Sequence, residues 1–520
     1  MSAPTPAPTL TRPLSRREGA LAGLAAGLLA LGAAEMVAAL TGPSSEPLVA
    51  VGDAFVDLTP AWLKEFATST FGTKDKLVLL SGAAVVVAAL CALAGVVTAR
   101  GRFRGPWVVL ALGTIAAIAA VTRPDATILS VVPSAAAAVV GALVLSALVD
   151  RLETSGVPGP GPDAAPDRRT MLRTVGIVAG SGAVALAAGR LLGSRTRGAE
   201  DSRAGVRLPA PASPGPALPA GVEVGVPGVA PFRVPAADFY RIDTALVVPR
   251  VRAEDWRLRI HGMVDHEVTL DFAALLASPL VERDVTLTCV SNDVGGDLVG
   301  NARWLGLPLG PLLRGAGPRS DADMVLSTSA DGFTASTPLS TLTDGRDALL
   351  AVGMNGAPLP LEHGFPVRMV VPGLYGYVSA TKWVVDLEVT RFDRASAYWT
   401  SRGWSPRGPI KTESRIDVPR AGAGLKAGRV PVAGVAWAQH VGIDRVEVRV
   451  DDGPWQPARL AAEASIDTWR QWVFAWDASP GKHTLQVRAT DRTGRTQTSD
   501  RADVLPDGAT GWHTIDVTVS

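Results

Sequence analysis

The side chains of this 520-residue chain that are best suited to bind a metal or attack a substrate are its two cysteines and six histidines. Cys91 lies in an apolar run, whereas Cys289 lies in the polar stretch DVTLTCVSND. A single cysteine in such a stretch is most often a small core residue, but a nucleophile or a metal ligand stays open. The histidines that could assist it are His261, His266 and His363. The clustered cysteines and histidines of a zinc site are absent from the sequence.

The residues around Cys289 have the pattern of a strand that opens into a loop. Apolar and polar side chains alternate, with Val285, Leu287 and Cys289 on one face and Asp284, Thr286 and Thr288 on the other. Period-two alternation predicts a half-buried strand. A glycine-rich stretch, GGDLVGNARWLG, follows. We therefore expect the thiol where a strand ends.

The N-terminal part of the chain has the composition of a membrane domain. The mean hydropathy of the chain is +0.23, and the apolar excess lies in the first two hundred residues. Four apolar runs are long enough to cross about 30 Å of hydrocarbon, and a fifth, glycine-rich run is weaker. They cover residues 19–41, 77–98, 105–122, 128–149 and 174–193. We expect a membrane domain of about five transmembrane helices over residues 1–193. Cys91 would then lie in the membrane and Cys289 outside it, so the two cysteines could not form an internal disulfide.

Arginines predict the orientation of these helices. They lie before the first run, between the second and third, and between the fourth and fifth, at Arg12, Arg16, Arg17, Arg100, Arg102, Arg104, Arg151, Arg168, Arg169 and Arg173. The N-terminus is then inside and, after five crossings, the C-terminal half is outside the cell membrane. No histidine precedes His261, so the membrane part has no imidazole for a b-type haem and reads as an anchor.

The fifth run is preceded by DRRTMLR, residues 167–173, which resembles a twin-arginine export signal. Ordinary positive-inside charge is the alternative. Such signals export proteins that are already folded, which suits a cofactor inserted in the cytoplasm. The run also contains Ala-Leu-Ala, so cleavage after export stays open.

The remaining sequence divides into three parts. Residues 194–235 are rich in proline, glycine and alanine and predict an extended, semi-rigid spacer. Residues 236–405 alternate short strand and helix patterns, as in a mixed α+β domain. Residues 406–520 contain strand patterns such as VPVAGVAWA, RVEVRVDDGPW and HTLQVRATD, which favour an immunoglobulin-like β-sandwich. The formal charge is +1 without a basic, aromatic-laced patch, so nucleic acid is not an expected partner.

Several motifs occur in a specific order in this outer part: FYRIDTALVVPRV, the strand ending in Cys289, ARWLGLPLGPLL, MNGAPLPLEHGFPVRMVVPGLYG, TKWVVDLEV and YWTSRGW. With them, residues 235–520 resemble the sulfite oxidase family of molybdenum enzymes. The resemblance implies a molybdopterin cofactor, with Cys289 as the protein's one thiolate ligand to molybdenum. In the family the trailing sandwich mediates dimerisation, so a homodimer is expected.

The resemblance also implies roles for other residues. His363 and Arg368 match family residues that hold the pterin and its phosphate, and a second cofactor-holding segment matches Ala380, Thr381 and Lys382. Asn292 is retained from the family's post-cysteine run and is placed with the cofactor-binding residues. Trp304 matches a tryptophan near an oxyanion pocket. The pocket's arginines are expected at Arg241 and Arg470, whereas Arg303 could join them or lie on the surface.

The sequence departs from the family just after the cysteine. Val290, Ser291, Asn292, Asp293 and Val294 replace the usual Ala-Gly-Asn-Arg-Arg, so an arginine that meets sulfite is missing and Asp293 would repel an anion. The resemblance does not extend to the haem domain of some family members, so we expect electrons to pass to or from a separate partner.

The expected function is oxygen-atom transfer on a small, sulfite-like oxyanion or another oxo-substrate. Alternatives are a sulfoxide or N-oxide reductase and a non-catalytic binding protein tethered to the membrane.

Overall fold

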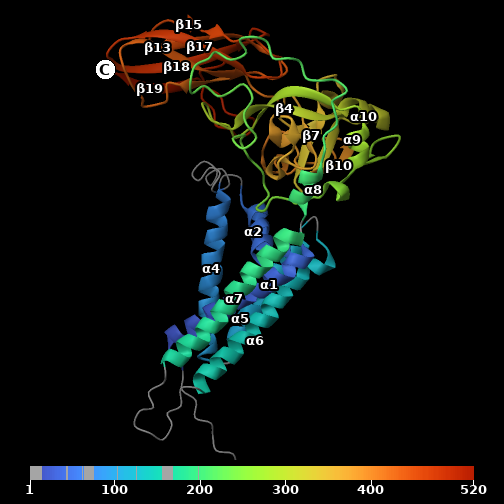
Figure 1. The fold of residues 1–520 in the computed structure, drawn as a ribbon, viewed down its shortest axis with the longest axis vertical. Coiled ribbons are helices and arrows are strands. Elements are labelled where there is room, and N and C mark those ends of the chain that lie inside the picture. Colours follow the sequence, from blue (N-terminus) through green and yellow to red (C-terminus); the bar gives the residue numbers. More distant parts are fainter. Residues whose placement is uncertain are drawn as a thin grey trace, which may run out of the picture. The chain divides into compact units, whose positions relative to one another are not determined.

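The computed structural model of the chain describes residues 14–42, 45–60, 63, 75–101, 104–123, 126–154, 168–196 and 198–520. These residues form two compact units (Figure 1). The first unit comprises Met1–Gly198 with Ala245–Val248, and the second comprises Ala199–Thr244 with Pro249–Ser520. Each unit has its own hydrophobic core.

The first unit is helical. Its helices are α1 (Arg16–Thr41), α2 (Pro47–Leu58), α4 (Asp75–Thr98), α5 (Arg104–Val121), α6 (Val132–Thr154) and α7 (Arg168–Thr196), with a 3-10 turn η3 (Ile128–Val131) before α6. Five helices in the described residues are long and apolar enough to cross a membrane, as the five runs predicted. The short helix α2 was not foreseen, because it lies in a mixed segment between two runs. α1 begins at Arg16 because Ser15 and Glu18 form a capping box.

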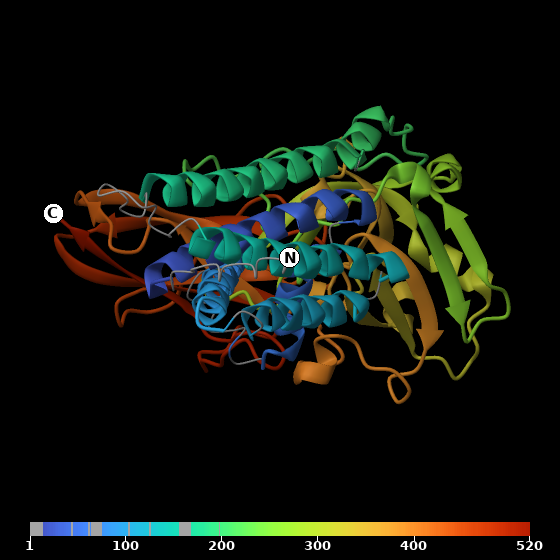
Figure 2. The ribbon, with the colours of Figure 1, turned by 90° about the horizontal axis from the view of Figure 1, so that it is seen from below.

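Helix α1 is the centre of this bundle and packs against α4, α6 and α7. Figures 1 and 2 show these helices side by side. Small residues allow the close approach: a Cβ at Gly23 would lie 2.0 Å from the Cys91 carbonyl oxygen, and one at Gly32 would lie 2.5 Å from that of Gly182. Such glycine contacts are typical of helix packing in membranes.

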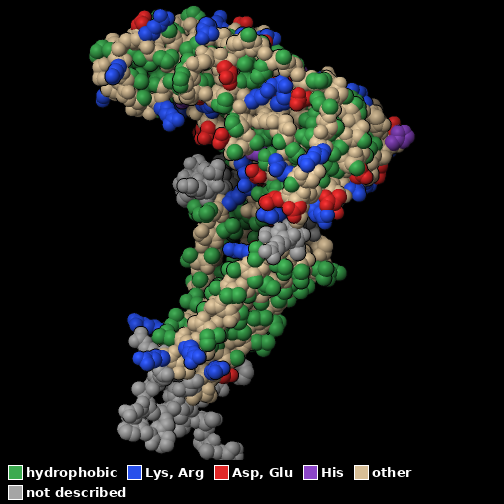
Figure 3. Space-filling model, in the orientation of Figure 1, with side chains coloured by type: hydrophobic (Ala, Val, Ile, Leu, Met, Phe, Trp, Pro, Cys, Tyr) green, Lys and Arg blue, Asp and Glu red, His purple; other side chains and the backbone are tan. Residues whose placement is uncertain are grey.

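The described arginine-bearing helix ends lie together at one end of the bundle. A Cβ at Gly19, near the start of α1, would lie 2.9 Å from the Gly95 oxygen near the end of α4, and Gly105 at the start of α5 lies against Thr98. The end of α6 and the start of α7 join the same core. Figure 3 shows Lys and Arg gathered at one end of an otherwise apolar bundle surface. Arg12, Arg102 and Asp167 lie outside the described residues.

The second unit begins with a mixed α+β region. One sheet has the order β2-β1-β10-β5-β6 and another the order β3-β4-β7-β8, with β9 paired to β7. The strands are β1 (Arg257–Gly262), β2 (Val268–Asp271), β3 (Val281–Thr288), β4 (Val299–Pro308), β5 (Met324–Ser329), β6 (Thr334–Pro338), β7 (Leu349–Met354), β8 (Ala357–Pro358), β9 (Arg368–Val370) and β10 (Val384–Thr390). The helices are α9 (Phe272–Ala277), α10 (Leu309–Ala316) and α11 (Leu339–Thr343), and one core cluster joins both sheets.

Two further sheets follow, β11-β13-β17-β16 and β12-β19-β18-β14-β15, and they share one core cluster. The strands are β11 (Glu413–Val418), β12 (Gly424–Leu425), β13 (Gly428–Trp437), β14 (Ile443–Val450), β15 (Gln456–Pro457), β16 (Arg459–Leu460), β17 (Arg470–Ala478), β18 (Gly481–Asp491) and β19 (His513–Val519). The expected strand patterns therefore form strands. The immunoglobulin-like class and the homodimer stay predictions.

The proline-rich segment is not the extended, semi-rigid spacer that its composition predicts. α7 extends to Thr196, a short helix α8 (Ala199–Gly205) follows, and the rest lies along the second unit. Arg203 Nε donates to the Leu359 oxygen at 2.7 Å, and the Val234 backbone N–H donates to the Asn301 oxygen at 2.8 Å. Phe232 is 2% exposed. The folded unit thus satisfies polar groups that a spacer would leave to water.

Candidate active site

Cys289 follows β3 directly, as the sequence predicts, but the second half of the strand is buried on both faces. Val285 and Leu287 face the core, and Thr286 and Thr288 on the opposite face are also fully buried. The prediction of a half-buried strand was wrong because residues of the C-terminal sheets cover the threonine face. The Cys289 N–H donates to the Leu298 oxygen at 2.9 Å, and this bond closes the loop that follows the strand.

The environment of Cys289 suits a metal ligand with few protein partners. Burial raises the pKa of the thiol, while hydrogen bonds from the backbone and side chain of Ser291 oppose that shift. Such donors stabilise a thiolate, the form that binds metals. The described residues contain no group of three histidine, cysteine or acidic side chains placed to hold a metal. A metal at Cys289 would therefore take other ligands from a non-protein group.

His363 is a neutral hydrogen-bonding group in this region. Its Nε2 lies 2.8 Å from the Ala236 oxygen, and its ring packs edge-on against Phe239 with centroids 5.7 Å apart. Because a carbonyl oxygen only accepts, Nε2 carries the hydrogen and Nδ1 is left as an acceptor. Burial, followed by the positive charge of Arg368, lowers the pKa of His363 to about 4. The imidazole is therefore neutral at pH 7.

Arg368 is a buried cation whose hydrogen-bond partners in the described chain are carbonyl oxygens. Its guanidinium donates to the oxygens of His363, Met369 and Ala380 at 3.1–3.4 Å. It lies over the Trp304 ring, with Cζ 5.1 Å from the centroid. Burial lowers the pKa of Arg368 to about 10. Carbonyl dipoles do not neutralise this charge, so a bound anion such as a phosphate would stabilise the site.

Lys382 lies beside Arg368 and shares a carboxylate with Arg241. Lys382 Nζ donates to Asp243 Oδ2 at 2.6 Å, and Arg241 Nε donates to the same oxygen at 2.9 Å. Gly364 has a φ of 108°, and a Cβ there would lie 2.9 Å from the Arg368 Cβ and 3.1 Å from the Lys382 Cβ. The glycine of the HGFPVR motif is thus needed for the two cations to converge.

Tyr240 connects this cation cluster to the cysteine. Burial raises the pKa of Tyr240, the charge of Cys289 raises it further, and Arg368 opposes the shift. Trp304 pairs with Arg283 across β3 and β4, and paired residues point to the same face of the sheet. Side chains alternate between faces along a strand, and Arg283 is six residues before Cys289, so Trp304 and Cys289 share a face. Cys289, Trp304, Tyr240, His363 and Arg368 therefore surround one region.

Three other predicted residues lie around this cluster. The Ala380 oxygen accepts from Arg368, and Thr381 Oγ1 is hydrogen-bonded to Ser327 Oγ at 2.7 Å. Asn292 Oδ1 accepts from the Leu298 N–H at 2.8 Å, so this side chain closes the post-cysteine loop. Their roles towards a cofactor stay predictions.

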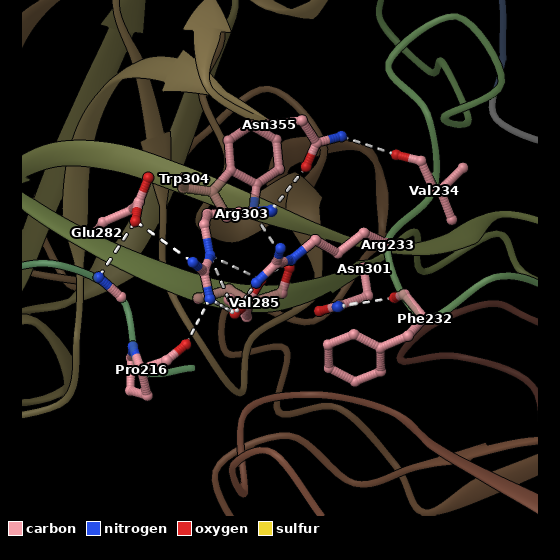
Figure 4. A network of polar contacts seen from close by, with 12 residues as sticks. Pro216, Phe232, Arg233, Val234, Glu282, Val285, Asn301, Arg303, Trp304 and Asn355 are labelled. Carbon is pink, nitrogen blue, oxygen red and sulfur yellow. Dashed lines mark hydrogen bonds and ion pairs between the residues drawn. The ribbon is translucent and has the colours of Figure 1, made fainter. Parts of the chain in front are cut away.

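Two predicted arginines are used elsewhere. Arg303 pairs with Asp284 across β3 and β4 and therefore lies on the opposite face of the sheet from Cys289. Its guanidinium contacts Asp284 Oδ2 at 2.6 Å, Glu282 Oε2 at 3.4 Å and the Pro216 oxygen at 2.7 Å (Figure 4). Arg470 donates to the oxygens of Ala461 and Ile443 in the C-terminal sheets.

Sequence reasoning missed two residues that flank Arg241. Tyr240 and Asp243 both belong to the FYRID motif that was already singled out, so the motif held a signal for them. Gln439 of the C-terminal sheets was also missed; it donates to the cysteine strand, and its position in the sequence gives no sign of that contact.

Comparison with known proteins now assigns the fold of this site. The family described as "Oxidoreductase molybdopterin binding domain" matches residues 245–399. The uncharacterized oxidoreductase YuiH of Bacillus subtilis is 33% identical over 153 residues, which are 29% of this chain and 74% of that protein. The chain belongs to the sulfite oxidase-like family of molybdopterin-dependent oxidoreductases.

Other relatives of this molybdopterin-dependent oxidoreductase include mitochondrial sulfite oxidase of Homo sapiens, 29% identical over 335 residues that are 53% of this chain and 60% of that protein. The chain thus spans less than two thirds of that relative. The solved structure of sulfane dehydrogenase SoxCD from Paracoccus pantotrophus aligns with a TM-score of 0.49 at 25% identity, over 56% of this chain and 81% of that one.

The residues of this oxidoreductase fit the cofactor that the family implies. Cys289 offers one buried sulfur that belongs to no described group of three metal-ligating side chains, and Arg368 offers a buried guanidinium without a described carboxylate partner. His363 Nδ1 offers a neutral acceptor. When bound, the cofactor supplies two-electron oxygen-atom transfer chemistry.

Proposed function

We propose that this chain is a membrane-anchored oxidoreductase that transfers an oxygen atom to or from a small oxo-substrate, with Cys289 as the protein ligand to molybdenum. The observation that carries the proposal is the convergence of Cys289, His363, Arg368 and Lys382. All four side chains are buried, Tyr240 is electrostatically coupled to both Cys289 and Arg368, and Arg368 is coupled to Lys382 and His363. His363, Arg368, Lys382 and the Ala380–Thr381 segment would hold the pterin and its phosphate.

The leading substrate class is a small sulfite-like oxyanion. Arg241 and Trp304 lie near the cofactor-binding residues and would form part of its pocket. An arginine side chain recognises an oxyanion through paired, charge-assisted hydrogen bonds. Arg241 is half-exposed, so it can exchange part of its contact with Asp243 for a contact with substrate.

A specific observation favours a second candidate, the reduction of a neutral sulfoxide or N-oxide. Arg303 faces away from Cys289 and Arg470 donates to two carbonyls, while Asp293 replaces an expected arginine. Fewer cations then face the site than an oxyanion pocket of the family would need. A neutral oxo-substrate does not require them.

We further propose that the helical unit crosses the cell membrane and that the catalytic unit faces the extracytoplasmic side. Five long apolar helices and the arginines at one end of the bundle support this topology. The twin-arginine-like signal at residues 167–173 also fits this proposal, because such signals export units that are already folded. We keep the proposed domains 1–193, 236–405 and 406–520, with an immunoglobulin-like class for the last, and count residues 199–235 with the second unit. A homodimer and a separate electron-transfer partner complete the proposal.

Measuring the molybdenum and pterin contents of the purified full chain tests the proposal. Protein made in a host that synthesises the cofactor is compared with a Cys289→Ser variant. We expect about one molybdenum per chain in the natural sequence and a changed spectrum of the metal centre in the variant. Natural protein without molybdenum would leave a membrane-tethered binding protein instead.

Steady-state assays then separate the two substrate classes. Oxidation of sulfite is followed with an artificial electron acceptor, and reduction of sulfoxides or N-oxides with a reduced dye as donor. Turnover of sulfite with a low KM supports the oxyanion class. Reductase activity without sulfite oxidation supports the second candidate.

A further inference from the structure

Loops of the C-terminal sheets reach the strand that precedes the cysteine. Gln439 lies between β13 and β14 and is 2% exposed. Its Nε2 donates to the Thr286 oxygen at 3.1 Å and to the Thr288 Oγ1 at 2.9 Å. Thr288 is the residue directly before Cys289. One amide group therefore joins the C-terminal sheets to the residue that precedes the thiol.

The same strand has a second set of bonds to these sheets. The Thr286 N–H donates to the Asp467 oxygen at 2.9 Å, and Thr286 Oγ1 accepts from the Trp469 N–H at 2.8 Å. After the cysteine, Arg415 Nη1 donates to the Gly296 oxygen at 2.8 Å. The segment around Cys289 is thus fixed on both sides by residues more than a hundred positions later in the sequence.

The buried Gln439 side chain is less favourable for stability than an apolar side chain would be at the same position. Its Oε1 is buried without a hydrogen-bond partner among the described residues. A buried, unpaired acceptor destabilises the folded state, whereas an apolar side chain of similar volume would not. The presence of an amide at this position is therefore explained by its N–H groups, which hold in place the strand that leads to the cysteine.

We infer that Gln439 is a positioning residue for Cys289 and that the C-terminal domain takes part in the metal site through it. The inference rests on the proposed function, in which Cys289 binds molybdenum. By holding the Thr286 oxygen and the Thr288 hydroxyl, Gln439 fixes the backbone at the cysteine and hence the direction of its Cα–Cβ bond. The sulfur is then placed before the cofactor binds, as preorganised ligands require.

The test compares Gln439→Met with a matched control, Gln471→Met. Gln471 is a second buried glutamine of the C-terminal sheets, but its amide bonds to residues 224 and 230, with Oε1 accepting from the Val224 N–H and Nε2 donating to the Ala230 oxygen. Thr288→Val removes the side-chain acceptor of Gln439 without a large change in volume. All variants carry Cys91→Ala, so that Cys289 is the remaining thiol.

The first measurement is the electron paramagnetic resonance spectrum of the partly reduced holoenzyme, together with its molybdenum content. We expect Gln439→Met and Thr288→Val to shift the g-values in the same way, with no further shift in the double variant. Gln471→Met should give the natural spectrum. An unchanged spectrum in Gln439→Met, or an equal shift in Gln471→Met, would overturn the inference.

The second measurement uses cofactor-free full-length protein and does not depend on metal. We expect Gln439→Met to raise the alkylation rate of Cys289 on the order of tenfold over Gln471→Met, because the strand end opens more often. Equal alkylation rates in the two variants would overturn the ordering role of Gln439. Absence of molybdenum from the natural protein would overturn the proposed function, while this rate would still decide whether Gln439 orders Cys289.

Discussion

Asp243 binds two cations through one oxygen: its Oδ2 accepts from Lys382 Nζ at 2.6 Å and from Arg241 Nε at 2.9 Å. Lys382 is buried, whereas Arg241 is half-exposed. Asp243 therefore connects a residue that we propose to hold the cofactor with one that we propose to meet the substrate. It also helps to keep the buried ammonium charged, because burial lowers the pKa of Lys382 to about 8 and Asp243 opposes that shift.

Retention of the cofactor should fall as the pH rises through about 8. The folded pKa of Lys382 is below its ordinary value, so the side chain is charged at pH 6 and loses its charge on the alkaline side of that value. An uncharged amine no longer attracts a phosphate. The pterin content that remains after gel filtration, measured between pH 6 and 9.5, should show the decrease.

Two variants check that Lys382 is the cause. Lys382→Arg keeps its charge throughout this range and should flatten the curve, whereas Lys382→Gln should retain little cofactor at any pH. If Lys382→Arg shows the same decrease as the natural protein, another group controls retention.

The sequence predicts the helices and strands of this protein better than it predicts which other parts of the chain they pack against. The five apolar runs and the strand before Cys289 are visible because their periods are local. The burial of Thr286 and Thr288 is not visible, because it depends on Gln439 and Trp469 far along the chain. Composition likewise indicates an extended segment before residue 235 but does not show that it packs on the second unit.

Arg303 illustrates the same limit within a motif. Its place next to Trp304 suggests the same pocket, but adjacent residues of a strand point to opposite faces. The structure accordingly gives Arg303 to Asp284 and Glu282, on the face opposite Cys289. The motif ARWLG therefore contains one residue near the site and one that holds β3, β4 and the preceding segment together.

Arg303→Gln should reduce stability and leave cofactor content unchanged. The change leaves Glu282 and Asp284 with fewer donors, although Asp284 keeps Arg233, so we expect a loss of roughly 1–3 kcal/mol in the free energy of unfolding. Thermal unfolding and molybdenum content measure the two quantities. Arg241→Gln is the comparison: it should alter substrate KM with less loss of stability. A lowered molybdenum content in Arg303→Gln would contradict this assignment.

Glu413 should make the second unit less stable as the pH rises. Burial raises the pKa of Glu413 to about 8, with the nearby amide of Asn292 and the charge of Lys411 opposing the shift. Since the unfolded carboxyl titrates near 4.5, the folded protein holds one extra proton between these values. Stability is fully present below about 4.5 and decreases up to about pH 8, by at most about 1.4 kcal/mol per pH unit.

Glu413→Gln should remove this dependence. The variant cannot lose a proton there, so its unfolding midpoint, followed by tryptophan fluorescence, should increasingly exceed that of the natural protein from pH 5 to pH 9. Glu267→Gln, at an exposed position, controls for the change in net charge. Parallel curves for the natural protein and Glu413→Gln would show that the carboxyl is ionised when folded.

The two ends of one long apolar helix give a direct test of the proposed topology. The span Ile128–Thr154 begins at Ile128, which is 92% exposed, and ends at the exposed Thr154 beside Arg151. The positive-inside rule predicts that Thr154 lies in the cytoplasm and Ile128 lies outside. After one more crossing, the C-terminal end of α7 would also lie outside. In a background with both Cys91→Ala and Cys289→Ser, Ile128→Cys should react with an impermeant thiol reagent in intact cells. Thr154→Cys should react only after permeabilisation, and the reverse pattern would place the catalytic unit in the cytoplasm, where neither export nor an external electron partner would apply.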